Sequence, residues 1–439
     1  MNMEREEIIK KVRDAGVVGC GGAGFPTHVK MAASAEFVIA NGAECEPILK
    51  GDQYLMAEKA SEIIAGVKYV MTSSSASRGY VGIKTKYRRQ GEALRKAAGP
   101  AIEIFEMGNF YPAGDEHVMV HEVTGRIVPE AGIPIDVGVI VDNVGTLINV
   151  SQAVEKGIPV TRKYVTVTGD VENPIIVRCA IGTRAGDIAA LANPRKANYM
   201  LINGGPMMGD IIDENFCITK TTGALIVMPF DHALASRKER SGRTSQRRAK
   251  SICDQCMDCT IVCPRNLIGH RIYPHKIMRM NFFDAEELNE ITSGSFLCSQ
   301  CGLCEAACPQ DLSPRSVFKS VKENLIKKGH RNILTSSDVT PHGMWELRKF
   351  SAHRLVERLG LAKLDREAVF YPKEIVPDKV KIALHQNVGA ASVPLARPGD
   401  EVKEGTLIAK IPEKSLGANL HSSINGTVVK IDENYIYIG

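Results

Sequence analysis

The sequence predicts a multidomain protein in which α/β and α+β units are joined to a cysteine-rich unit. Helical patterns alternate with short β-rich runs over residues 1–158, and short strands separated by Gly, Pro and Asn turns follow. Two cysteine runs with the same internal spacing then occur between residues 251 and 330. A chain of 439 residues is long enough to bury a separate hydrophobic core in each of these units.

The first unit, residues 1–158, is expected to be an α/β domain. The stretch REEIIKKVRDAG predicts a helix because Ile8, Ile9 and Val12 fall on one of its faces. The runs EFVIANGAE and VGVIVDNV are short and apolar, which predicts strands.

The remaining units differ from the first. Over residues 159–232, the runs KYVTVTGDV, PIIVRCAIGT, YMLINGGPMMG and GALIVMPF predict strands around one helix, RAGDIAALA, which fits an α+β unit of β-grasp type. Residues 376–439 alternate short strands with turns, which predicts a small β-barrel or sandwich. A helical connector, residues 331–375, contains the only tryptophan, Trp345, and joins this barrel to the cysteine-rich unit.

The basic charge of the chain is concentrated in one segment. The net charge is +5, and SRKERSGRTSQRRAK alone holds seven Lys or Arg residues against one Glu, so the rest of the chain is close to neutral. We expect residues 233–250 to be a solvated basic linker before the cysteine-rich unit. Nucleic-acid binding is the alternative, but the segment has no aromatic residue that could stack on bases.

The composition and the N-terminus indicate a cytoplasmic protein. The longest apolar-looking stretch is interrupted by Asp136, Asp142 and Asn143, so no membrane span is expected. The first residues are charged throughout and lack the apolar core of a secretion signal. In a reducing compartment the twelve cysteines are expected to serve as ligands and free thiols. Four of them lack ligand spacing and are expected to be buried structural residues: Cys20, Cys45, Cys179 and Cys217.

The two cysteine runs, CDQCMDCTIVCP and CSQCGLCEAACP, predict two [4Fe–4S] clusters. In two-cluster bacterial ferredoxins, three cysteines of one run and the fourth of the other hold each cluster. One cluster would therefore be held by Cys253, Cys256, Cys259 and Cys308, and the other by Cys298, Cys301, Cys304 and Cys263. Structural zinc also uses paired CxxC motifs, but it gives no reason for the same four-cysteine run to occur twice.

The glycine-rich stretch GVVGCGGAGFPTHVK predicts a loop that approaches a phosphate. Gly19, Gly21 and Gly24 match GxGxxG, and Glu44 follows at the distance of the acidic residue in dinucleotide-binding sites. That fingerprint must follow a strand, whereas a helical pattern precedes these glycines, so a Rossmann site is not expected. Glycines still allow backbone amides to come close to a phosphate.

Longer motifs in the same unit resemble a known superfamily. GCGGAGFPTHVK, IANGAECEPILKGD, YPAGDEH, TGRIVPEAGIP and VGVIVDNVGT resemble motifs of the complex I flavoprotein subunit, of RnfC subunits and of PduS-type cobalamin reductases of bacterial microcompartments. The second unit resembles the SLBB β-grasp domain of these proteins. The resemblance implies a complex I flavoprotein-like FMN domain, an SLBB domain, a bacterial 2[4Fe–4S] ferredoxin-type domain and a C-terminal barrel-sandwich hybrid. With the barrel at the end of the chain, the domain order favours the PduS type over RnfC.

The resemblance also implies residues that bind FMN and NADH, and no catalytic acid or base. Gly21, Gly22, Gly24 and Phe25 would back the flavin and nicotinamide, and Lys30 would contact the FMN phosphate. Asn41 and Glu44 would meet the flavin ring or the nicotinamide ribose, and Asn143 would close the site. The full set of expected cofactor-binding residues is Gly19, Gly21, Gly22, Gly24, Phe25, Lys30, Asn41, Glu44 and Asn143. A general acid and base pair of Glu44 and Glu46 is the alternative, but hydride transfer to flavin does not need one.

The implied activity is NADH-dependent reduction of cobalamin toward cob(I)alamin. The expected partners are a corrinoid, an adenosyltransferase and a microcompartment shell protein, and the expected location is inside a bacterial microcompartment. Two alternatives remain open: an RnfC-like subunit of a larger electron-transfer complex, and a redox scaffold without flavin. A near match to a cobalamin-binding motif at Asp115 and His117 is interpreted as coincidence, because Val120 stands at the glycine position.

Overall fold

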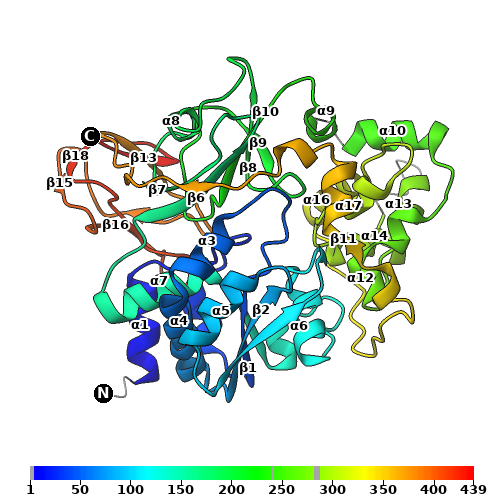
Figure 1. Cartoon of the computed structure of the whole chain (residues 1–439), viewed down its shortest axis with the longest axis horizontal. Helices are drawn as coiled ribbons and strands as arrows, with labels where there is room; N and C mark the ends of the chain where they lie inside the picture. The colour runs from blue at the N-terminus through cyan, green and yellow to red at the C-terminus, as the bar shows by residue number, and fades with distance from the viewer. Residues whose placement is uncertain (1–3, 240–241, 281–286) are drawn as a thin grey trace.

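The computed structural model describes residues 4–239, 242–280 and 287–439. Figure 1 shows the first unit at the bottom, the β-grasp unit above it, the cysteine-rich unit on the right and the C-terminal barrel on the left. The order of the units along the chain is the predicted one. None of the helices in the described ranges has the length and apolar character needed to cross a bilayer.

The first unit is built around a parallel sheet with the strand order β3-β2-β1-β5. Parallel strands need crossover connections, and helices supply most of them here. The strands are β1 Phe37–Asn41, β2 Arg78–Lys84, β3 Ile102–Met107 and β5 Val139–Asn143, with β4 Phe110–Tyr111 outside the sheet. The helices are α1 Arg5–Asp14, α2 Thr27–Ala32, α3 Gly51–Glu58, α4 Ala60–Ser74, α5 Arg88–Ala97, α6 Glu116–Thr124, the 3₁₀ helix η1 Pro134–Val137 and α7 Val144–Lys156.

The second unit is the expected α+β fold. Its sheet has the order β12-β7-β6-β10-β8-β9, and the two central strands, β6 and β10, run parallel. The elements of this unit are β6 Arg162–Gly169, β7 Ile175–Ala180, α8 Ala185–Ala190, β8 Met200–Asn203, β9 Asp210–Ile212 and β10 Ala224–Met228. Every predicted run forms its strand or helix, and the short edge strand β9 was not predicted.

The basic segment is not a solvated linker, which corrects the expectation from composition. It forms α9 Ala233–Glu239 and α10 Gly242–Ile252, on either side of residues 240–241, which lie outside the described ranges. Ser245, Gln246 and Ala249 of α10 are buried, and this helix packs on α16 Pro314–Lys327. Arg247 and Lys250 lie on the exposed face of this amphipathic helix, whereas in α9 Arg237 pairs with Asp311 and Lys238 donates to Gly209 O.

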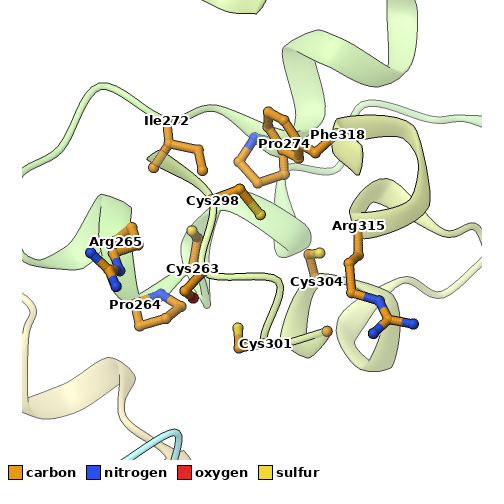
Figure 2. Close-up of a pocket in the computed structure, with 12 residues that line it drawn as sticks. Cys263, Pro264, Arg265, Ile272, Pro274, Cys298, Cys301, Cys304, Arg315 and Phe318 are labelled. Atoms are coloured by element: carbon orange, nitrogen blue, oxygen red, sulfur yellow. The ribbon is translucent and has the colours of Figure 1, made fainter. Parts of the chain in front are cut away.

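The cysteine-rich unit consists of short helices around a core that includes Phe318. Besides α10 and α16, its helices are α11 Asp258–Ile261, α12 Pro264–Leu267, α13 Pro274–Arg279, α14 Glu290–Leu297 and α15 Leu303–Ala307. Residues 281–286 of the predicted domain lie outside the described ranges. Figure 2 shows cysteine side chains of both runs drawn together between these helices.

The connector, residues 331–375, is less helical than expected. Its elements are η3 Glu346–Arg348, β11 Phe350–Ser351, α17 Ala352–Arg358, η4 Ala362–Leu364 and β12 Val369–Phe370. Strand β11 pairs with β4 of the first unit, and β12 adds to the edge of the β-grasp sheet beside β7. The connector therefore ties three units together.

The C-terminal unit is the expected small β-structure. It has a four-stranded sheet, β13-β19-β18-β15, and a three-stranded sheet, β14-β16-β17, around one apolar core. The strands are β13 Val380–Ala383, β14 Val393–Pro394, β15 Glu401–Val402, β16 Leu407–Lys410, β17 Leu420–His421, β18 Gly426–Ile431 and β19 Tyr435–Ile438.

A buried lysine joins this barrel to the first two units. Lys220 of the β-grasp unit is 2% exposed, and its Nζ donates to Gly16 O at 2.7 Å and to Asn419 O at 2.6 Å. These carbonyls belong to the first unit and to the barrel. Val388 N of the barrel also donates to Ala23 O in the glycine-rich loop at 3.1 Å. Three units therefore meet beside the glycine-rich loop.

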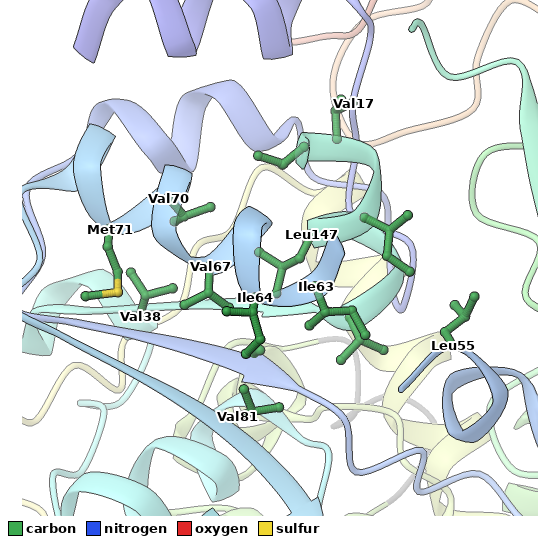
Figure 3. Close-up of a cluster of buried hydrophobic side chains, with 14 of the residues drawn as sticks. Val17, Val38, Leu55, Ile63, Ile64, Val67, Val70, Met71, Val81 and Leu147 are labelled. Atoms are coloured by element: carbon green, nitrogen blue, oxygen red, sulfur yellow. The ribbon is translucent and has the colours of Figure 1, made fainter. Parts of the chain in front are cut away.

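The main core of the first unit lies between its sheet and the helices α4 and α7 (Figure 3). Helix α4 supplies a row of buried side chains at helical spacing: Ile63, Ile64, Val67, Val70 and Met71. The two helices approach so closely that a Cβ added at Gly66 would lie 2.2 Å from Leu147 O, so only glycine fits there. This packing holds the strands β1 and β5, whose ends carry the predicted flavin-site residues.

Candidate electron-transfer site

Two cavities in the cysteine-rich unit are each lined by four cysteines. The inner cavity is lined by Cys263, Cys298, Cys301 and Cys304 (Figure 2). The outer cavity is lined by Cys253, Cys256, Cys259 and Cys308. The structure therefore brings together three cysteines of one run with the fourth cysteine of the other, in the two sets expected from the sequence. Both sets fit a [4Fe–4S] cluster.

The two runs share the same local backbone. Gln255 and Gln300 have φ of 55° and 60°, and Met257 and Gly302 have φ of 68° and 77°. A short helix, α11 or α15, begins directly after the second of these left-handed residues. Each glutamine side chain also donates to the first cysteine of its run, at 3.2 Å and 3.3 Å. The repeated sequence spacing thus encodes a repeated cysteine-presenting turn.

The pairing of the thiols favours clusters over single zinc ions. Each set takes three cysteines from one run and the fourth from the other, as in two-cluster ferredoxins. Burial raises the pKa of Cys259 and of Cys263 to about 12, so ligation to iron must displace a proton from each thiol.

The strand order of the first unit predicts where it binds a ligand. In open α/β sheets, ligands bind beyond the carboxyl ends of the strands, where the strand order reverses direction. From β1 the chain moves to β2 and β3 on one side, and it returns to β5 on the other side. Asn41 ends β1 and Asn143 ends β5, and these two residues are register partners. The structure therefore places two of the predicted flavin-site residues together at the reversal point.

The glycine-rich loop lies over the same edge of the sheet. It follows α1 and not a strand, as expected, and Gly19 N closes it by donating to Phe25 O at 3.0 Å. A Cβ added at Gly21 would lie 3.0 Å from Asn143 Nδ2, whereas a Cβ at Gly22 would meet no atom within 4 Å. An exposed, uncrowded loop backbone next to Asn143 leaves room for a flavin, so the residues fit FMN.

Gly24 has a different role in this loop. Its φ is +75°, and an added Cβ would lie 2.8 Å from Thr221 Cγ2 of the β-grasp unit. Glycine is therefore required there by the backbone conformation and by packing between units. In this motif Gly22 therefore leaves space for a cofactor, whereas Gly24 sets the shape of the loop.

Lys30 is already paired within the protein. Its Nζ donates to Val141 O at 2.7 Å and lies 3.4 Å from Glu116 and 3.5 Å from the buried carboxylate of Asp142. Burial acts to lower the pKa of Lys30, but the charges of Asp142 and Glu116 outweigh it and raise that pKa above its usual value. Its contact with the FMN phosphate stays a prediction.

Asn41 and Glu44 shape the loop after β1. Asn41 Nδ2 donates to Gly114 O at 2.9 Å, and Glu44 accepts hydrogen bonds from Asp52 N at 2.8 Å and Gln53 N at 3.2 Å, at the start of α3. Burial first, and then the charge of Asp52, raise the pKa of Glu44. These contacts give both residues a positioning role, and their contacts with flavin or nicotinamide stay predictions.

Asn143 links the strand end to its neighbours. Its Oδ1 accepts from Gly145 N at 2.8 Å, which caps α7, and its Nδ2 donates to Asp52 Oδ2 at 2.8 Å. Asp52 was not among the predicted site residues. Asp52 is the last residue of the motif IANGAECEPILKGD. The motif gave no signal of this contact, because Asp52 and Asn143 are far apart in sequence.

The contacts between the first unit and the inner cavity were not predicted from the sequence. Tyr111 is 1% exposed, and its hydroxyl donates to Cys301 O at 2.6 Å. Arg265, which lines the inner cavity, pairs with Asp115 at 3.1 Å. The first unit, which carries the predicted flavin site, is therefore joined to the lining of the inner cavity by buried polar contacts.

Glu46 makes a further contact across units. Its carboxylate accepts hydrogen bonds from Met207 N at 2.9 Å and Met208 N at 2.8 Å, in the loop after β8. Arg315 Nη1, another residue lining the inner cavity, donates to Met207 O at 2.9 Å. Burial raises the pKa of Glu46. This geometry does not form the acid and base pair considered for Glu44 and Glu46.

Three family models match the chain in the order of its units. Residues 12–152 match the Nuo51 FMN-binding domain, residues 252–313 match a 4Fe-4S dicluster domain, and residues 372–439 match the RnfC barrel sandwich hybrid domain. The protein therefore has an FMN domain and a domain for two [4Fe–4S] clusters, as expected.

Comparison over the full length decides the family. The chain is 39% identical to cobalamin reductase PduS of Salmonella typhimurium, over 100% of this chain and 97% of that protein. It is also 39% identical to PduS of Citrobacter freundii, over 99% and 97%. The chain belongs to the PduS cobalamin reductase family. The predicted family and fold class are confirmed.

More distant relatives share parts of this PduS-family chain. A component of the Na(+)-translocating ferredoxin:NAD(+) oxidoreductase complex of Acetobacterium woodii is 33% identical over 66% of this chain and 64% of that protein. The crystal structure of an NAD+-reducing [NiFe]-hydrogenase in the air-oxidized state matches with a TM-score of 0.50 at 20% identity, covering 83% of this chain and 68% of that chain. The latter similarity concerns the fold alone.

Proposed function

We propose that the protein is an NADH-dependent flavin and iron–sulfur oxidoreductase that reduces cobalamin toward cob(I)alamin. The full-length identity to cobalamin reductases supports the substrate, and the FMN and dicluster domains support the cofactors. Bound FMN supplies two-electron chemistry toward NADH and one-electron chemistry toward the clusters. The observation that carries this proposal is the two four-cysteine cavities next to an FMN domain in one chain.

The residues of this chain supply binding and orientation. The exposed backbone of Gly21 and Gly22 would back the flavin, and Asn143, fixed by Asp52, would hold one side of it. Asn41 and Glu44 hold the loop after β1, and Lys30 offers a cation at the same edge of the sheet. The eight cysteines would ligate the clusters in the two sets that line the inner and outer cavities.

The partners and the location are proposed from the resemblance to this family. A corrinoid would be the electron acceptor, and an adenosyltransferase would use the reduced corrinoid. We place the protein in the cytoplasm, inside a bacterial microcompartment with a shell protein as a further partner. For the domain limits we propose 1–158, 159–232, 251–330 and 376–439, with 233–250 and 331–375 as connecting segments.

The experiment is anaerobic reduction with a matched pair of glycine variants. NADH should bleach the flavin of the wild-type protein, and cob(III)alamin added next should be reduced. Gly22→Val should lose FMN, because a branched side chain fills space that the protein itself leaves empty. Gly99→Val is the control. Gly99 also has no atom within 4 Å of an added Cβ, but it precedes β3, the outer strand on the other side of the sheet from β5.

Each outcome bears on the proposal. If Gly99→Val keeps FMN and Gly22→Val loses it, while both variants denature at the same temperature without flavin, the loop binds the cofactor. Retention of FMN by Gly22→Val would contradict the assignment of the loop. Flavin bleaching by NADH without cobalamin reduction would favour the second candidate, an electron-transfer subunit like the Acetobacterium woodii relative, which shares 33% identity with this chain.

A further inference from the structure

The two cysteine cavities differ in their surroundings. Three cysteines of the inner cavity are buried, with Cys263 at 8%, Cys301 at 8% and Cys304 at 9% exposure, and Cys298 is partly buried. In the outer cavity Cys256 is exposed, and the lining residue Met257 is 43% exposed. A cluster in the outer cavity would therefore lie at the protein surface, and one in the inner cavity would not.

The inner cavity is fastened to the flavin-site unit. Tyr111 Oη donates to Cys301 O, and the lining residue Arg265 pairs with Asp115, so both contacts reach the first unit directly. Asn41, at the predicted flavin site, also donates from Nδ2 to Gly114 O. Gly114 directly precedes Asp115 in the chain, so this hydrogen bond connects the predicted flavin site to the contact between Asp115 and Arg265. The inner cavity and the predicted flavin site are thus separated by one short, buried stretch of the first unit.

The outer cavity has a different set of contacts. Its lining residues bond within the cysteine-rich unit and α10, as Gln310 does with Asp254 at 2.7 Å and Gln255 with His275 O at 2.9 Å. In the described part of the chain, the hydrogen bond that leaves these elements comes from Arg358 of the connector, to Cys308 O at 3.4 Å. Within the described ranges, these lining residues make no hydrogen bond or ion pair with the first unit.

We infer that the inner cavity holds the cluster that receives electrons from the flavin and that the outer cavity holds the cluster that delivers them to the acceptor. The inference rests on the proposed function, because it orders the steps of that reaction. One NADH gives a hydride, which leaves NAD+ and carries two electrons. Each cluster passes one electron at a time, so two one-electron oxidants, here the corrinoid, are reduced and one proton is released.

The physical reason is distance. The rate of electron transfer falls steeply as the gap between the centres grows, so a donor inside the protein uses the centre that is packed against it. A large acceptor can approach only a centre near the surface. The buried inner set meets the first condition, and the outer set, with exposed Cys256 and Met257, meets the second.

One test of this order needs neither NADH nor cobalamin. Oxidised holoprotein would be treated with an iron chelator, and iron release would be followed by absorbance. We expect two phases of about four irons each, because the outer cluster is accessible and the inner one is buried. Cys256→Ser should remove the fast phase, and Cys301→Ser should remove the slow phase. A single phase of about eight irons, or the opposite assignment of the variants, would overturn the difference in depth.

The second test follows reduction by electron paramagnetic resonance after rapid freezing. In Cys256→Ser, NADH should reduce the inner cluster at the wild-type rate, while cobalamin reduction falls at least tenfold. In Cys301→Ser, the flavin should bleach normally, but the outer cluster should be reduced at least tenfold more slowly. Dithionite should reduce the remaining cluster in both variants. Fast reduction of the outer cluster by NADH in Cys301→Ser would overturn the order, even if cobalamin is not the acceptor.

A second pair of variants keeps all cysteines, so it tests the inference even if the cysteine variants misfold. Gln300→Leu removes an amide that donates to Cys298 Sγ at 3.3 Å, and Gln255→Leu removes the matching amide that donates to Cys253 Sγ at 3.2 Å. Loss of a hydrogen bond to a ligating sulfur lowers the reduction potential of its cluster. We therefore expect Gln300→Leu to lower the midpoint potential of the cluster that NADH reduces first and Gln255→Leu to lower that of the other cluster. The reverse pairing would contradict the inference.

Discussion

Replacing Lys220 by methionine should change how the junction of the three units depends on pH. Burial lowers the pKa of Lys220 to about 7, and within the described ranges no carboxylate pairs with it. Its Nζ donates to Gly16 O and Asn419 O, and a neutral amine still has two N–H donors for these carbonyls. Deprotonation therefore removes a buried charge without losing either hydrogen bond.

The sign and the size of the effect follow from proton linkage. When the junction opens, Lys220 meets water and its pKa returns toward the ordinary value of 10.5. Between the two pKa values the open state binds more protons, so the free energy of opening rises with pH. Below the lower pKa both states are protonated and the pH has no effect. From pH 6 to pH 8 the gain is about 1.4 kcal/mol, or about tenfold in the opening equilibrium.

Hydrogen exchange measured by mass spectrometry can detect this change. The amide of Val388 donates to Ala23 O across the same junction, so its protection reports the opening. At each pH the protection of the wild type is divided by that of Lys220→Met, which cancels the intrinsic exchange rate. Other buried groups with shifted pKa, such as Lys84 and Lys238, occur in both proteins and cancel as well.

The ratio should rise about tenfold from pH 6 to pH 8. His421 faces Lys220, but burial, and then the charge of Lys220, hold its pKa at about 3, far below this range. Exposed Lys379 of the barrel provides the control, because Lys379→Met should leave the ratio constant. A ratio for Lys220→Met that changes less than twofold would refute the conclusion that burial controls the charge of this lysine.

Three further predictions concern the clusters and the predicted flavin site. Chemical analysis of anaerobically prepared protein should find about eight irons and eight acid-labile sulfides per chain, and stoichiometric zinc without sulfide would contradict the cluster assignment. Cys263→Ser should damage the cluster of the second run more than that of its own run, because Cys263 lines the inner cavity. Equal loss of both cluster signals in the electron paramagnetic resonance spectra would contradict this assignment. Lys30→Ala should destabilise the flavin-free protein by about 3–5 kcal/mol in urea denaturation, since it leaves Asp142 buried without its cation, and Lys30→Arg should restore most of this loss.

The sequence allowed good prediction wherever the signal was local. The cysteine sets follow from spacing, because each CxxCxxC run folds into one turn and helix whose φ values repeat between the runs. The strands β1, β5 and β10 follow from apolar runs that become buried on both faces. The basic segment was predicted wrongly because its charges dominate the composition, while the few small and polar residues that α10 buries, such as Ser245 and Ala249, give a weak pattern.

Contacts between units could not be predicted in this way. Tyr111 and Cys301 are 190 positions apart, and neither residue type signals a hydrogen bond from a hydroxyl to a backbone carbonyl. Lys30 shows the same limit at the site itself. The motif indicates a cation, but only the structure shows that Asp142 and Glu116 already share its charge.

The polar contacts between units explain why the first unit, the β-grasp unit and the cysteine-rich unit adopt one arrangement relative to each other. Burying a charge costs roughly as much as its partner returns, so pairs such as Arg265 with Asp115 add little net stability. A partly buried carboxylate that loses its hydrogen bonds is costly, however, and Glu46 finds Met207 N and Met208 N in only one arrangement of the units. Such contacts therefore penalise displaced arrangements more than they stabilise the correct one. Electron transfer needs this property, because its rate depends so steeply on the distance between the flavin edge and the inner cavity.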